Sequence, residues 1–76
     1  MDTNSLEKVG YALVLLQEIC LGYDTHAYRS RCAGLLRDVF SQHQKMLRLI
    51  EYWVANAVEN RDMLRAVEAY FERNPF

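Results

Sequence analysis

The chain has 76 residues, enough for one hydrophobic core and too few for two separate domains. Its net charge of −1 excludes a general electrostatic attraction to nucleic acid or to anionic lipid. Hydrophobic residues make up 51% of the chain, more than a lone bundle of this size easily hides. We therefore expect a partner surface, most simply a second copy in a homodimer.

The amino-terminal segment MDTNSLEK is acidic and polar, unlike a secretory signal. The longest apolar run, residues 11–16, is far shorter than the ~20 residues that span a membrane. The two cysteines are then expected to be reduced thiols. These features predict a cytoplasmic protein without a membrane span.

The first expected helix covers residues 5–21, with N-cap candidates at Thr3, Asn4 and Ser5 and a left-handed stop at Gly22. Its apolar seam comprises Leu6, Val9, Leu13, Leu16 and Cys20. Four more aliphatic residues, which one neighbouring helix cannot all cover, are candidates for an interaction surface: Val14, Leu15, Ile19 and Leu21.

A second helix is expected over residues 25–58, capped by Asp24 or Thr25. Apolar residues recur there at alternating spacings of three and four, and neither Pro nor any Gly after Gly34 interrupts them. The segment from Ser41 to Gln44 has the spacing of a capping box, so a break after Phe40 is the alternative. Because the apolar arc keeps its phase, we predict one continuous helix.

The last expected helix covers residues 61–73, after a polar cluster in which Asn60 is a plausible cap. Pro75 forbids its continuation. The ending Asn74-Pro75-Phe76 resembles the tripeptide bound by eukaryotic EH-type adaptor domains, and we interpret it as a helix stop. The prediction is a single all-α domain, residues 1–76, a chain of three helices in which the first and last pack on the long central one. A dimer would complete a four-helix cross-section.

Few residues carry recognisable chemistry. His43 lies on the apolar arc of the central helix. It could act as a pH switch or as a ligand. The alternatives are a neutral core histidine that hydrogen-bonds across an interface and a residue that marks a break in the helix. Cys20, His26 and Cys32 have the spacing C-x5-H-x5-C, which matches no compact zinc module. Enzyme motifs are absent from the sequence. We therefore expect no enzyme, cofactor or metal site, with a small metal-binding protein as an alternative.

The central segment is basic between two acidic ends, and three cations form a basic stripe on its polar side: Arg37, Lys45 and Arg48. Such a stripe can follow a phosphate backbone, so a nucleic-acid-binding regulator is an alternative. The favoured interpretation is an ordinary solvated face. The sequence thus predicts a small helical regulator, adaptor or inhibitor that binds a protein partner through an apolar helix face.

Overall fold

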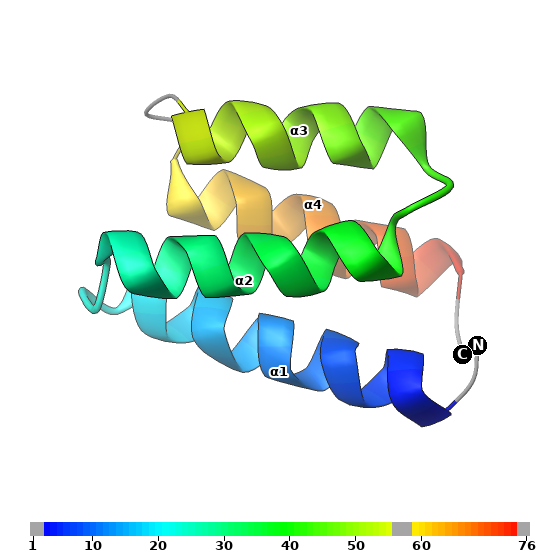
Figure 1. Cartoon of the computed structure of the whole chain (residues 1–76), viewed down its shortest axis with the longest axis horizontal. Helices are drawn as coiled ribbons and strands as arrows, with labels where there is room; N and C mark the ends of the chain where they lie inside the picture. Colours follow the sequence, from blue (N-terminus) through cyan, green and yellow to red (C-terminus); the bar gives the residue numbers. More distant parts are fainter. Residues whose placement is uncertain (1–2, 56–58, 75–76) are drawn as a thin grey trace.

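The computed structural model describes residues 3–55 and 59–74, and they form four α-helices (Figure 1). The helices are α1 (Thr3–Cys20), α2 (His26–Val39), α3 (Gln44–Ala55) and α4 (Asn60–Arg73). No strand occurs among these described residues, which confirms the all-α prediction. In the same part of the chain, no helix is both long and apolar enough to cross a membrane.

The four helices form a closed ring of neighbours. Each helix packs against the next one along the chain, and α1 also packs against α4. Figure 1 shows the four axes running side by side, with α1 and α2 as the most extensively paired helices. One chain therefore builds a four-helix cross-section by itself. The predicted three-helix arrangement is wrong, and so is the argument that a dimer is needed to complete that cross-section.

The predicted continuous helix over residues 25–58 is broken between α2 and α3, and its last residues, 56–58, lie outside the described residues. The Phe40 N–H donates to the Leu36 carbonyl at 2.8 Å, and the His43 N–H donates to the Phe40 carbonyl at 2.8 Å. The Met46 N–H then donates to His43 Nδ1 at 3.2 Å. His43 is thus the N-cap of α3, and this turn reverses the chain without Gly or Pro.

The turn between α1 and α2 agrees with its sequence signals. The Tyr23 N–H donates to the Glu18 carbonyl and the Gly22 N–H to the Ile19 carbonyl, which is the Schellman pattern. Gly22 has φ of 116°, a left-handed conformation that side chains disfavour. Thr25 Oγ1 accepts from the Tyr28 N–H at 3.2 Å, so Thr25 caps α2 as predicted.

The core lies along the common axis of the four helices. It is formed mainly by Ala12, Leu16, Ile19, Cys32, Ala33, Leu36, Phe40, Met46, Ile50, Trp53, Met63 and Val67. On α1 the buried positions are Val9, Ala12, Leu16 and Ile19. This face is rotated from the predicted seam, because α1 packs against both α2 and α4 and buries the side that lies between them.

At one end of the bundle, four residues from different segments form a closed polar ring, in which Trp53 takes part through its backbone carbonyl and its indole N–H: Asp24, Arg29, Trp53 and Asn60. Arg29 donates to both carboxylate oxygens of Asp24, at 2.7 and 2.8 Å, and to the Trp53 carbonyl at 3.0 Å. Trp53 Nε1 donates to Asn60 Oδ1 at 2.8 Å, and Asn60 Nδ2 donates to Asp24 Oδ2 at 3.1 Å. The Arg29 guanidinium also lies 5.3 Å from the Trp53 ring centroid.

The polar ring lowers the pKa of Asp24 to about 2. The main cause is hydrogen bonding from Arg29, followed by hydrogen bonding from Asn60, since both stabilise the charged carboxylate. The ring joins the α1–α2 turn to α2, α3 and α4.

At the opposite end, an aromatic cluster takes the place of the polar ring. It comprises Phe40, His43, Tyr70 and Phe71. Phe40 meets Tyr70 edge-to-face at 4.9 Å between ring centroids, and His43 meets Tyr70 in the same way at 5.1 Å. The α2–α3 turn is thereby packed against the end of α4.

Candidate interaction surface

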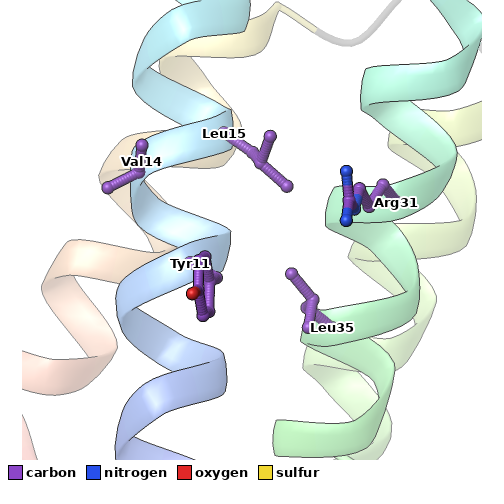
Figure 2. A pocket seen from close by; sticks show the side chains of 5 residues that line it. All are labelled: Tyr11, Val14, Leu15, Arg31 and Leu35. Atoms are coloured by element: carbon purple, nitrogen blue, oxygen red, sulfur yellow. The ribbon is translucent and has the colours of Figure 1, made fainter.

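A concave surface joins two helices, α1 and α2. This groove has a volume of about 340 Å³ and is lined by Tyr11, Val14, Leu15, Arg31 and Leu35. Figure 2 shows Leu15 and Leu35 extending toward each other from the two helices, with Tyr11 beside them and Val14 at the outer edge. Arg31 contributes the only charged side chain of this lining.

The groove lining combines exposed and half-buried apolar side chains. Tyr11 is 68% exposed and Val14 is 52% exposed, while Leu15 and Leu35 are half-buried. A shallow depression with Glu7 and Gly10 in its lining adjoins the groove and shares Tyr11 and Val14 with it. The result is a continuous, mostly apolar surface with one carboxylate and one guanidinium on it.

The register of α1 against α2 fixes the relative heights of these two charges. Cys32 Sγ donates to the Ala12 carbonyl at 3.4 Å, and Lys8 pairs with Asp38 at 3.3 Å. The two helices are thus antiparallel, and Arg31 lies beside residues 13–14 of α1. Glu7 is about two turns away, about 10 Å along the axis. Within the described residues, neither charge has an ion-pair partner.

The four predicted interaction residues of α1 fall in different places. Val14 and Leu15 line the groove. Leu21 is 78% exposed but lies beyond the end of α1, in a separate depression with Cys20 and Arg61. Ile19 is 1% exposed, so its assignment to an uncovered surface is wrong: it lies on the side of α1 that faces the shared core.

The predicted basic stripe is divided by the chain reversal. Arg37 belongs to α2, whereas Lys45 and Arg48 belong to α3, where both are exposed. Arg37 pairs with Glu51 of α3, and its second contact measures 3.3 Å between Nη2 and Oε2. Hydrogen bonding between them raises the pKa of Arg37 and lowers that of Glu51. The premise of a single continuous helix carrying the stripe is therefore wrong.

His43 and the proposed metal ligands are placed by local structure. His43 is half-buried, caps α3 and packs in the aromatic cluster. The structure does not gather Cys20, His26 and Cys32: no group of three such ligand residues comes together in residues 3–55 and 59–74. Burial raises the pKa of the Cys32 thiol to about 12, which disfavours its thiolate.

Sequence reasoning missed Tyr11, Arg31 and Leu35 as parts of the surface. Tyr11 lies three residues before Val14 and four before Leu15, so the three share one side of a helix. That spacing is a usable signal, but the antiparallel register that adds Arg31 and Leu35 depends on the tertiary structure. Part of Asn74-Pro75-Phe76 lies outside the described residues, and α4 ends at Arg73.

Comparison with known proteins adds no relative. A scan against protein-family models and searches of curated proteins and of solved structures found no match.

Proposed function

We propose that this protein is a non-enzymatic protein–protein interaction module and that the α1–α2 groove is its binding surface. The observation that supports this proposal most directly is the exposure of Tyr11 and Val14 beside a groove that both residues line. Exposed apolar side chains that gather around a concavity are typical of binding sites, whereas scattered ones are ordinary surface.

The groove fits an amphipathic helix better than a flat surface. It lies between two antiparallel helices, and its apolar lining is accompanied by a cation at one side. A helix lying in such a groove inserts apolar anchors at spacings of three, four and seven residues. A carboxylate on the same helix would pair with Arg31 and fix its register.

The test compares two substitutions that place a charge on exposed apolar positions. Val14→Asp alters the groove, and Tyr52→Asp is the matched control on α3, where Tyr52 is 59% exposed. We expect both variants to stay folded, because neither side chain is in the core. Tagged wild-type and variant proteins are then used to capture binding proteins from the native cells.

Proteins that bind the wild type and Tyr52→Asp but not Val14→Asp would support the groove. The proposal fails if Val14→Asp retains every bound protein, a second copy of the chain included.

A further inference from the structure

We propose that the depression between the start of α3 and the end of α4 binds a small organic phosphate monoester, with Lys45 and Arg73 holding the phosphate group. This site lies on different helices from the α1–α2 groove and does not depend on the function proposed for that groove. The proposal follows from the charges, the hydrogen-bond donors and the apolar wall of the depression.

Two helices bring a cation each to this depression. The start of α3 lies beside the end of α4 (Figure 1), and His43 meets Tyr70 there at 5.1 Å between ring centroids. Lys45 in the first turn of α3 and Arg73 in the last turn of α4 both line the depression. Its volume of about 470 Å³ is that of a small-molecule site. Cations that are far apart in the sequence therefore line one site.

The charged side chains of the lining have one sign. Lys45 and Arg73 are exposed, and within residues 3–55 and 59–74 neither forms an ion pair. The positions three and four residues away on the same helix, where a helical ion pair would form, hold no acidic residue for either cation. Glu72 adjoins Arg73 in the chain, but adjacent residues of a helix do not face each other, and Glu72 does not line the depression. An anion that enters therefore meets two cations and no lining carboxylate.

The charges and donors favour a phosphate over a carboxylate. A phosphate monoester carries about −1.5 to −2 charges at pH 7, which matches two cations, whereas a carboxylate carries a single charge. Arg73 can donate two parallel N–H bonds to phosphate oxygens, and Lys45 supplies a compact charge. His43 Nδ1 accepts from the Met46 N–H at 3.2 Å, so a neutral His43 carries its proton on Nε2 and offers a third donor.

The apolar part of the lining favours an organic phosphate over inorganic phosphate. Met46 and Tyr70 line the depression together with Ala69, whose short side chain is exposed. An aromatic or aliphatic group attached to the phosphate can pack on the thioether of Met46 and the ring of Tyr70. The net charge of −1 supplies no general attraction for a polyanion such as a nucleic acid. The site therefore fits one phosphate group that carries a small apolar substituent.

The first experiment measures the binding of phenyl phosphate to the full chain, with inorganic phosphate and benzoate as comparison ligands. Titrations at pH 7 and low salt are followed through the amide signals in two-dimensional NMR spectra. We expect the signals of residues 43–46 and 69–74 to shift most. Phenyl phosphate should bind about tenfold more tightly than either comparison ligand, because it alone supplies both the second negative charge and the apolar group.

The second experiment removes single cations from the same two helices. Lys45→Gln and Arg73→Gln each remove one cation of the lining, whereas the controls Arg48→Gln and Arg65→Gln each remove one exposed cation outside it. All four positions are exposed, so the variants should remain folded. We expect each lining variant to weaken phenyl phosphate binding about fivefold and each control by less than about twofold.

The third experiment gives Arg73 the acidic partner that its helix lacks. Ala69→Glu places a carboxylate four residues before Arg73, where the two side chains can pair across one helical turn. The control Ala27→Glu adds the same charge at an exposed position in the first turn of α2. We expect Ala69→Glu to weaken phenyl phosphate binding about tenfold and Ala27→Glu to leave it within about twofold, with helicity retained in both by circular dichroism.

Four results would overturn the inference. The first is an absence of amide shifts with phenyl phosphate up to about 10 mM, where even weak binding is detected. The second is inorganic phosphate or benzoate binding as tightly as phenyl phosphate, and the third is a lining variant that weakens binding no more than its control. The fourth is a single-stranded DNA of about ten nucleotides that binds more tightly than phenyl phosphate, which would assign the two cations to a nucleic acid instead.

Discussion

The two ends of the bundle join the helices by different interactions. At one end, the polar ring connects the α1–α2 turn to α2, α3 and α4 through directional hydrogen bonds. At the other end, the aromatic cluster packs the α2–α3 turn against α4 through ring faces and edges. Removing a residue of the polar ring leaves its hydrogen-bond partners unpaired, whereas truncating a side chain of the aromatic cluster leaves a cavity. The two ends should therefore respond differently to substitution and to pH.

The largest effect is expected from Phe40→Ala at the aromatic end. Phe40 is almost fully buried and contacts both Tyr70 and Phe71. Losing a buried phenyl group should lower the free energy of unfolding by about 3–5 kcal/mol, measured by urea denaturation. A loss of only about 1 kcal/mol would show that capping, rather than packing, holds this end.

At the polar end, Arg29→Met should lower the free energy of unfolding by about 1–3 kcal/mol. The change keeps an unbranched apolar stem but leaves Asp24 and the Trp53 carbonyl without their shared donor. Arg65→Met on the exposed side of α4 is the control and should change stability by less than about 0.5 kcal/mol. Equal effects of the two variants would show that the polar ring contributes no stability of its own.

A smaller loss of stability is expected when the N-cap of α3, which lies at the aromatic end, is removed. His43→Ala should cost about 1 kcal/mol, because the Met46 N–H loses its acceptor. His43→Asn replaces the imidazole with another residue that caps helices well, so it should recover part of that loss. Thermal unfolding followed by circular dichroism compares the two variants. If alanine and asparagine behave alike, the histidine acts through its ring contacts instead.

The smallest effect is the acid response of the polar end. The pKa of Asp24 is about 2 in the folded chain, below its ordinary 3.8, so the unfolded state binds a proton first. The stability that Asp24 contributes is complete above about pH 4 and is lost as the pH falls through about 2. Because Asp24 is partly exposed, solvent screening keeps this contribution small. Asp24→Asn should therefore narrow the stability difference between pH 5 and pH 2, and an unchanged difference would contradict the assignment.

The sequence allowed much of the local structure to be predicted. The helical ends near Leu21 and Arg73, the left-handed Gly22 and the Thr25 cap all rest on interactions between residues close in the chain. Such signals act over one turn, so they can be recognised without the tertiary structure. The buried Met63 and Val67 follow from the same short-range periodicity.

The structure breaks the central helix where the alternative placed the break, after Phe40, although the sequence analysis preferred a continuous helix. Ser41 has the spacing of a capping residue, but the cap is the imidazole of His43, two residues later. The apolar pattern continues through the turn, since α2 and α3 both face the same core. For a related reason, only the α1 side of the candidate groove could be predicted from the sequence. Arg31 and Leu35 join Tyr11 in its lining only because α1 and α2 pair in their observed register.

The polar ring also bears on which of two mirror topologies the chain adopts. Four short amphipathic helices joined by tight turns can circulate around a shared core in a left-turning or a right-turning sense, and apolar packing tolerates both. Hydrogen bonds are directional, and the contact of Asn60 with Asp24 joins two turns 36 residues apart. In a bundle of the opposite handedness, these two turns would face each other with different sides. The four residues of the polar ring would then lose their hydrogen-bond partners. A modest set of polar contacts can thus select a single handedness for the whole bundle.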